Sequence, residues 1–413
     1  MWKSYLIGCV CVLLLGNITL AQIYGCTDPL ANNYNASATH NDGTCLYNAA
    51  SLVPVLSVTL GSSLTETSGL IRWNSYVWTH NDNTDINLYA LDTLTGNIVQ
   101  TCALSAAVNQ DWEEISQDSN YVYIGDFGNN ADGNRTDLKI LRIEKNSILL
   151  NVPVIDTIYF SYADQIDFSP AGANNTDFDC EAFIVTTDSI FLFTKQWVSN
   201  KTIVYSLPKT PGTYIANLRD TLNVGGLITG STYLEPQRLT VLCGYSNMLQ
   251  PFIYLLYDFT GNDFFGGNKR KIDLSLSFHQ TEGIATSDGL KYYISNEYFT
   301  QPPSVNTPQK LHTLDLSTYL SGYLTGSPEN IPANTPLTGF QIYPNPAGET
   351  ITLQSGNDLL PFDYRITDIS GRNVFSSKIT QQTTRIELNN LVPGIYFIRA
   401  GQTSVRTIKF VKE

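Results

Sequence analysis

The sequence is poor in charged residues, methionine and histidine. Charged residues make up only 15% of the 413 residues, with 2 Met and 4 His. So low a charge content argues against disorder and against a coiled coil rich in Lys and Glu. No His or Cys cluster suits zinc. By contrast, the 24 Tyr, 18 Phe and 29 Gly are typical of β-strands and turns.

Basic residues are scarce too. The 24 Lys and Arg against 37 Asp and Glu give a formal charge of −13, so we expect no nucleic-acid partner. Residues 1–21 are typical of a secretory signal peptide, with Lys3, an apolar run over residues 5–15 and a small-residue cleavage site at Ala21. No later run approaches the ~18 apolar residues of a membrane helix, so we expect no transmembrane span in the mature chain.

The cysteines indicate an oxidising compartment. Loss of the signal peptide leaves Cys26, Cys45, Cys102, Cys180 and Cys243, an odd number, so at least one thiol has no partner within the chain. A disulfide between Cys26 and Cys45 would close a loop of about 20 residues and stabilise it by about 3 kcal/mol. The sequence leaves the pairing of the other three open.

That loop belongs to a short polar module, residues 22–50, which contains Gly25-Cys26-Thr27-Asp28-Pro29 and ends near Asp42-Gly43-Thr44-Cys45. The module resembles short GCTDPxAxNY…DGxC modules in surface proteins of Bacteroidetes, which implies a surface or adhesion setting and no particular activity. Its side-chain oxygens suit calcium, but we favour the alternative that they are turn residues. The four residues concerned are Asp28, Asn32, Asn41 and Asp42.

Residues 51–326 contain five stretches with one plan: a small or acidic anchor residue, a β-rich strand, then a polar loop. The anchors are spaced by 45, 68, 48 and 53 residues, near the 40–50 or so of a four-stranded blade. We therefore predict an all-β chain with a β-propeller of five or six blades, in which residues 55–60 complete the last blade. A pair of β-sandwiches is the alternative. The anchors are Ser68, Glu113, Glu181, Thr229 and Glu282.

Short motifs add a family resemblance to this segment. They are Asp111-Trp112-Glu113-Glu114-Ile115, the run from Tyr123 to Asn130, and Thr281-Glu282-Gly283-Ile284. Through them the segment resembles secreted bacterial β-propellers of the SdiA-regulated and esterase-like phytase type. The resemblance implies a fold rather than a reaction.

Three anchors are glutamates. Because the innermost strands of a propeller line a central channel, Glu113, Glu181 and Glu282 are predicted to form one ring around its axis. Together with Asp126 they are the candidate metal ligands, and calcium is the ion that suits clustered carboxylates. The alternative, which we favour, is that each glutamate accepts backbone hydrogen bonds from the next blade.

Polar residues on loops at one rim of the propeller are the candidate ligand-binding groups. They are Asp82, Arg135, Lys195 and Glu297. The two cations suit a phosphate or carboxylate group, but we favour them as ion-pair partners of Glu113 and Glu181. The catalytic candidates are Glu113, Lys195 and His80, the last as a general base if it faces the channel. A lone histidine in a loop more often only forms hydrogen bonds.

The last segment has a pattern of its own. Prolines over residues 327–338 indicate a semi-rigid linker, and residues 339–413 alternate strand patterns with turns, as in a small immunoglobulin-like β-sandwich. Spaced motifs are Tyr343-Pro344-Asn345-Pro346, Gly371-Arg372, Gly394-Ile395-Tyr396 and Lys409. With them the segment resembles the C-terminal sorting domain of the type IX (Por) secretion system. This implies the type IX machinery as a partner and a location outside the cell or on its outer membrane.

These observations favour an exported propeller that binds an extracellular ligand, a glycan or a protein. The alternative is a calcium-assisted hydrolase of a phosphoester, ester or lactone at the channel mouth, and a structural surface protein is a third class. No GxSxG, HExxH, P-loop or GxGxxG occurs, so the usual serine hydrolases, zincins and nucleotide enzymes have no support. A hydrolase requires at least three carboxylates that converge on an open point.

Overall fold

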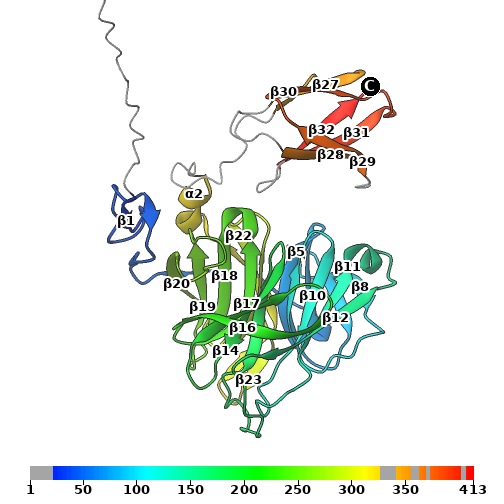
Figure 1. Ribbon diagram of the computed structural model, residues 1–413. Helices are drawn as coiled ribbons and strands as arrows, with labels where there is room; N and C mark the ends of the chain where they lie inside the picture. The colour runs from blue at the N-terminus through cyan, green and yellow to red at the C-terminus, as the bar shows by residue number, and fades with distance from the viewer. Residues whose placement is uncertain (1–21, 326–340, 355–361, 369–372, 401–405) are drawn as a thin grey trace, which may run out of the picture. The chain divides into compact units, whose positions relative to one another are not determined.

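The computed structural model describes residues 22–413 except 326–340, 355–361, 369–372 and 401–405 (Figure 1). The predicted signal peptide, residues 1–21, and the predicted linker, residues 327–338, lie outside the described residues. The chain divides into two compact units between Gly326 and Ser327. No described helix is long and apolar enough to cross a membrane.

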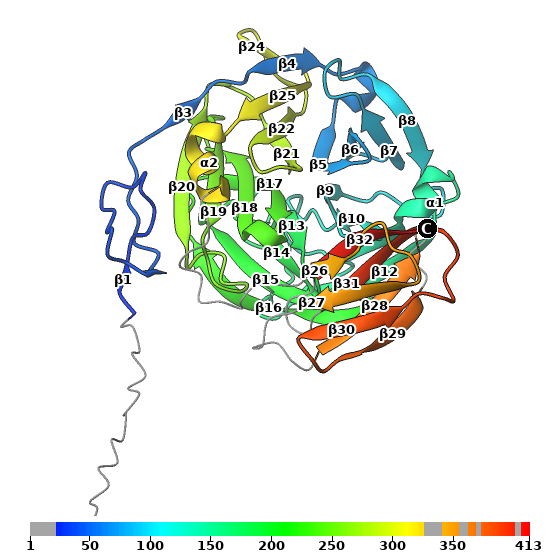
Figure 2. The same cartoon turned by 90° about the horizontal axis from the view of Figure 1, so that it is seen from above.

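Within its described residues, the first unit contains five four-stranded blades around a central axis (Figure 2). The innermost strands contact one another in a closed ring, so the propeller predicted with five or six blades has five. From the axis outward the blades are β5 (Thr67–Trp73), β6 (Tyr76–Asn81), β7 (Asn87–Leu91), β8 (Ile98–Ala103); β9 (Trp112–Gln117), β10 (Tyr121–Asp126), β11 (Lys139–Glu144), β12 (Ile155–Tyr162); β13 (Asp179–Val185), β14 (Ser189–Lys195), β15 (Thr202–Pro208), β16 (Gly212–Leu222); β17 (Leu227–Leu234), β18 (Leu239–Tyr245), β19 (Pro251–Tyr257), β20 (Asn268–Leu274); and β21 (Thr281–Thr286), β22 (Lys291–Asn296), β25 (Lys310–Asp315), β4 (Leu56–Thr59).

The fifth blade takes its outermost strand from the beginning of the propeller sequence. Strand β4 pairs antiparallel with β25, with Thr59 opposite Lys310, which confirms that residues 55–60 complete the last blade. Two further pairings cover sheet edges: β12 pairs parallel with β16, and β3 (Ser51–Leu52) pairs parallel with β20. These pairings join the blades and leave fewer unpaired strand edges.

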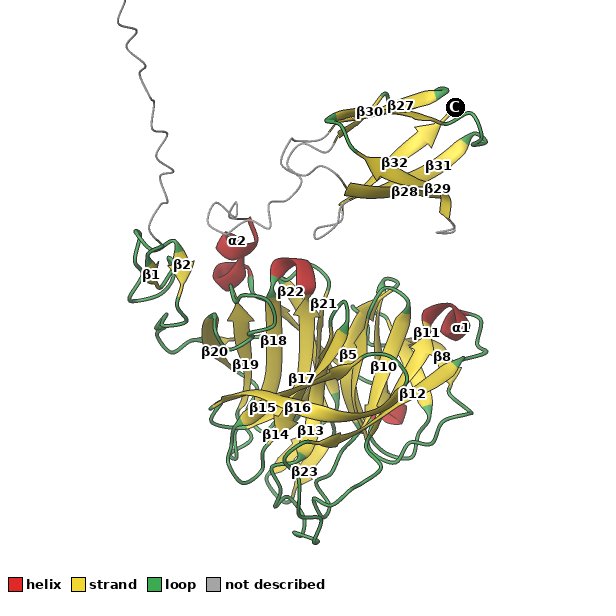
Figure 3. Ribbon diagram, viewed as in Figure 1, coloured by secondary structure: helices red, strands yellow, loops and turns green. Residues whose placement is uncertain are grey.

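A separate hydrophobic core fills each interface between neighbouring blades. Successive residues of one strand pack on opposite faces of its blade. In β22 of the fifth blade, Tyr292 packs toward the fourth blade and Tyr293 toward the first. Both faces of a blade are therefore buried, which is why the strands read as near-continuous apolar runs. Figure 3 shows that strands and loops dominate, with the short helices α1 (Lys145–Leu149) and α2 (Ser317–Thr325) between them.

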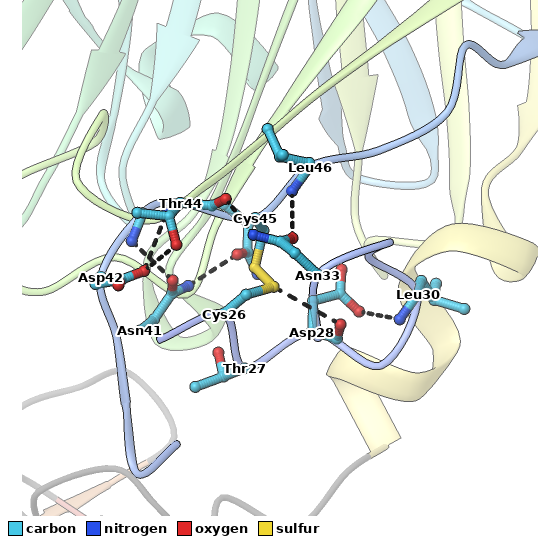
Figure 4. Close-up of a disulfide and its surroundings, with 12 residues drawn as sticks. Cys26, Thr27, Asp28, Leu30, Asn33, Asn41, Asp42, Thr44, Cys45 and Leu46 are labelled. Carbon is cyan, nitrogen blue, oxygen red and sulfur yellow. Dashed lines mark hydrogen bonds between the residues drawn. A yellow bond between two sulfur atoms is a disulfide. The ribbon is translucent and has the colours of Figure 1, made fainter. Parts of the chain in front are cut away.

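The N-terminal module packs on the fourth blade through polar contacts. Its strands β1 (Tyr24–Gly25) and β2 (His40–Asn41) pair in parallel, and Cys26 and Cys45 form the predicted disulfide (Figure 4). The Asn41 amide donates hydrogen bonds to Asp258 Oδ2 (3.1 Å) and Asn268 Oδ1 (2.8 Å). The first unit therefore includes the module and the propeller as one body.

The side-chain oxygens of Asp28, Asn41 and Asp42, offered for calcium in this module, are engaged within the protein. Asp28 accepts hydrogen bonds from the Leu30 N–H (2.9 Å) and from the hydroxyls of Tyr47 and Tyr257 (2.8 and 2.5 Å). Asp42 accepts from the Thr44 N–H and Asn41 Oδ1 accepts from the Gly43 N–H, whereas Asn32 donates its amide N–H to Asn48 Oδ1. These bonds support the turn-residue interpretation.

The second unit contains two facing sheets. One has the order β26 (Gln341–Tyr343), β27 (Thr350–Gln354), β30 (Thr383–Glu387), and the other has the order β29 (Asn373–Ile379), β28 (Phe362–Asp368), β31 (Gly394–Ala400), β32 (Arg406–Lys412). Ile351 and Ile386 from the first and Ile366, Ile398 and Phe410 from the second share one core. The predicted β-sandwich is therefore confirmed. The motif residues Gly371 and Arg372 lie outside the described residues.

Candidate functional site at the channel mouth

All five innermost strands are irregular at the same place. In each blade the pairing between the innermost strand and the second strand shifts at the anchor residue. Such a β-bulge turns a side chain away from the sheet. Blades two, three and five place a glutamate there, as the ring prediction requires. The five anchors are Ser68, Glu113, Glu181, Thr229 and Glu282.

Two hydroxyl groups form blade-to-blade hydrogen bonds at this level. Ser68 Oγ donates to the Glu113 carbonyl, and Thr229 Oγ1 donates to the Thr281 carbonyl at 2.5 Å. Within the described residues, nothing donates a hydrogen bond to the carboxyl groups of Glu113 or Glu282, although both residues are buried, with exposed fractions of 6% and 7%. The favoured structural role for the glutamates is therefore wrong for these two.

Lys195 is a buried cation that pairs with one of the ring glutamates. It lies at the end of β14, 4% exposed, and its Nζ is 2.5 Å from Glu181 Oε2. The ammonium also faces the rings of Trp197 and Tyr245, with Nζ 4.6 and 5.3 Å from their centroids. The predicted pairing of Lys195 with Glu181 is confirmed.

Burial raises the pKa of all three ring glutamates well above the usual value. Neighbouring carboxylates add to the shift, and the charge of Lys195 opposes it at Glu181 and Glu282. Burial disfavours the charge of Lys195 itself, but Glu181 and Glu282 outweigh that effect and raise its pKa. The ring holds more negative groups than its one lysine balances.

A second set of acids lies two residues before the ring positions. Glu66, Asp111 and Asp179 precede the anchors of the first three blades. The carboxyl groups of Asp111 and Glu113 converge, because a Cβ on Gly128 would lie 2.4 Å from Asp111 Oδ2 and 2.2 Å from Glu113 Oε1. Sequence reasoning missed these acids as a set, although their constant offset from the anchors is visible in the sequence.

The rim of the channel opens to solvent through half-buried acids. Glu66, Asp82 and Glu297 each place one carboxylate oxygen so that the three oxygens lie within 4.8 Å of one another. Burial and the charge of Glu66 raise the pKa of Asp82 to about 7, and burial and the charge of Asp82 raise that of Glu297 to about 8. The structure thus brings together the predicted rim residues Asp82 and Glu297.

Asp126 and Arg135 are engaged elsewhere. Asp126 is fully buried, with Oδ1 2.8 Å from Arg135 Nη2 and Oδ2 2.8 Å from Lys139 Nζ. Arg135 also binds Asp137 and the Gly128 carbonyl. The predicted pairing of Arg135 with Glu113 is therefore wrong. Since two cations neutralise Asp126, it is not available as the fourth metal ligand, and Arg135 is not free for a ligand.

His80 does not line the mouth. Its ring is wholly buried, with Nδ1 3.1 Å from the Asn81 carbonyl, and packs edge-on against Trp112 with centroids 5.8 Å apart. Burial lowers its pKa to about 4, so the ring is neutral. A general base must reach its substrate, so the structure removes His80 from the catalytic candidates.

Glu114 crosses the channel beneath the ring. It is on β9 in the second blade, and its Oε2 accepts the Ser231 N–H from β17 in the fourth blade at 2.6 Å. A Cβ on Gly69 would come within 2.3 Å of Glu114 Oε1, so this crossing requires glycine there. No sequence signal distinguishes Glu114, because its role depends on which blades face each other.

Two described residues of the sorting motifs, Asn345 and Tyr396, contact strand β32. Asn345 Oδ1 accepts the Val411 N–H at 3.0 Å, and its amide donates to the Lys409 carbonyl at 3.1 Å. The Tyr396 ring stacks on Phe410 with centroids 5.7 Å apart. Residues 341–413 are a secretion system C-terminal sorting domain. This sorting domain directs the chain to the type IX secretion machinery, so the protein is secreted or displayed at the cell surface.

Solved structures with similar folds have low identity to the chain. PorZ, a surface component of the type IX secretion system of Porphyromonas gingivalis, is 14% identical with a TM-score of 0.31; the match covers 84% of this chain and 45% of PorZ. An aldose sugar dehydrogenase from Streptomyces coelicolor is 9% identical with a TM-score of 0.39, covering 63% and 97%. An exo-β-1,3-galactanase from Phanerochaete chrysosporium is 10% identical with a TM-score of 0.38, covering 86% and 99%.

The chain thus spans less than half the length of PorZ. No curated protein matches the sequence at a significant level. None of the structural similarities carries an inference about activity.

Proposed function

We propose that the chain is an exported surface protein whose propeller binds an extracellular ligand, a glycan or a protein, at the acidic mouth of its channel. One observation carries this proposal: half-buried carboxyl groups converge at the rim, and within the described residues none of them forms an ion pair. Like charges held this close cost stability unless protons or a ligand neutralise them. The chemistry favours a ligand that brings amines, guanidinium groups or a bound cation.

Aromatic rings beside the acids support a glycan. Trp197 is half-buried next to Lys195, and its indole N–H donates to Asp179 Oδ2 at 2.7 Å, which fixes the ring. A fixed indole offers a flat apolar face on which a sugar ring can stack.

Arrays of glycans, with and without amino groups, and of peptides test the proposal on the full exported chain. The mouth variant Asp111→Asn/Glu297→Gln should lose most of the binding. The matched control Glu144→Gln/Asp273→Asn makes the same two kinds of substitution at exposed positions of β11 and β20, and should bind like the unmodified protein. Binding that is unchanged in the mouth variant, or absent from every array, would refute the proposal.

A second function, a calcium-assisted hydrolase of a phosphoester, ester or lactone, is favoured by one feature. Glu113 is buried, has no hydrogen-bond partner among the described residues, and lies beside Asp111. Burial and the charges of Glu181 and Asp111 raise its pKa, as a general acid near neutral pH requires. Turnover of nitrophenyl phosphate, nitrophenyl acetate or a lactone that Glu113→Gln abolishes would favour the hydrolase; no turnover would exclude it for these substrates.

A further inference from the structure

Three carboxyl groups at the junction of the first and fifth blades are held together by backbone bonds. Glu66 precedes β5, Asp82 follows β6 and Glu297 follows β22. The Asp82 N–H donates to the Glu66 carbonyl at 3.1 Å, and the Tyr298 N–H donates to the Thr65 carbonyl at 2.7 Å. The loops therefore fix three negative groups side by side, with oxygens within 4.8 Å of one another.

A buried acid next to this trio has no partner of its own. Glu282 is 7% exposed, and nothing within the described residues donates a hydrogen bond to its carboxyl group or forms an ion pair with it. Its carboxyl group is close enough to Lys195, Glu181, Glu297 and Asp82 for their charges to act on it, and Lys195, the cation among them, already pairs with Glu181. A buried acid without a hydrogen bond is costly unless something neutralises it, and one lysine that is shared with Glu181 leaves an excess of negative charge beside the trio.

We propose that Glu66, Asp82 and Glu297 bind one calcium ion, with Glu282 as a further negative group beside it. The donors are all carboxylate oxygens, the set that calcium prefers. Ligands on opposite sides of calcium are about 4.6–5.2 Å apart, since each lies about 2.3–2.6 Å from the ion. Three oxygens within 4.8 Å of one another can therefore bind the same calcium ion. Magnesium usually keeps several waters and is bound through only one or two carboxylates, so a set of three carboxylates favours calcium.

This ligand set replaces the one expected from the sequence. The sequence offers the ring glutamates and Asp126 only as candidate metal ligands, but Asp126 and Glu181 each have a cation. Within the part of the chain that the structure describes, the rim trio forms no ion pair and is half-buried, so water or ligand hydroxyl groups can complete the coordination of the ion. In that last respect the inference rests on the proposed function, because a glycan could bind through the ion.

Calcium titration calorimetry on the full exported chain, after treatment with EDTA, tests the site. We expect one site with a Kd of about 10⁻⁴–10⁻³ M, as in extracellular calcium modules. Asp82→Asn/Glu297→Gln should weaken binding by about tenfold or more, whereas Glu144→Gln/Asp273→Asn should leave it unchanged. Circular dichroism checks that each variant folds, and Glu66→Gln provides a milder single change.

No calcium binding by the unmodified chain would overturn the inference, as would equal binding by the trio variants. These failures are distinguishable from failure of the proposed function. Glycan or peptide binding that persists in EDTA, without any calcium binding, overturns only the ion site. Calcium binding that the trio variants abolish, without binding on the arrays, supports the ion site and overturns only the proposed ligand binding.

Discussion

Replacing Lys195 by methionine should cost the propeller several kcal/mol of stability. The ammonium and the Glu181 carboxylate are 4% and 3% exposed and 2.5 Å apart, so neither has water to replace its partner. Removing one member of a buried ion pair costs about 3–5 kcal/mol, because the other charge stays buried and unpaired. For a domain of this size that loss lowers the melting temperature by on the order of 10 °C.

Urea unfolding followed by tryptophan fluorescence measures the loss. Lys209→Met is the matched control: its pair with Asp118 is more exposed, at 21% and 17%, so it should cost no more than about 1 kcal/mol. The loss in Lys195→Met should shrink from pH 8 to pH 5, since Glu181 can take up a proton in place of its lysine. A loss below about 1 kcal/mol, or one that is equal at both pH values, contradicts a buried pair at the ring.

Three further predictions concern the rest of the chain. Burial raises the pKa of Asp111 to about 6, above its ordinary value. The contribution of Asp111 to stability is therefore full below about pH 4 and is lost as the pH rises through 6. Melting temperatures measured in EDTA should show this decline, and Asp111→Asn should flatten it. Cys26→Ser/Cys45→Ser should lose about 3 kcal/mol in urea unfolding because it opens a loop spanning 19 residues; an unchanged midpoint contradicts this. Deletion of residues 341–413 should keep the protein inside a cell that has the type IX machinery, as fractionation would show; surface display without the sorting domain would exclude the export role.

Much of the fold follows from local patterns in the sequence. The apolar runs that recur at blade spacing require two buried faces, which a propeller supplies, and residues 55–60 have the alternation of a strand with no neighbour in sequence to pair with. The disulfide follows from two cysteines in a polar segment too short for a core. These features depend on residue type and spacing, which the sequence contains.

The site was only partly predictable, because its contacts depend on ring closure. The glutamates at the anchors share a position within each repeat, and that position was visible. Glu66 and Glu297 meet because the first and fifth blades are neighbours in the ring, although 231 residues (297 − 66) separate them in sequence. Arg135 is on the loop between β10 and β11, and the conformation of that loop places it on Asp126 rather than on Glu113.

The pairing of β4 with β25 in the fifth blade has a consequence for how the protein folds. Because β4 must pair with β25, whose partner residues follow it by about 250 positions, the fifth blade cannot form until almost the whole propeller sequence is present. Contacts so distant in sequence make folding slow. Until then the unpaired strands β4 and β25 can pair with other chains, a known route to aggregation. An N-terminal fragment released by early termination or proteolysis should therefore aggregate or be degraded rather than persist as a smaller folded protein.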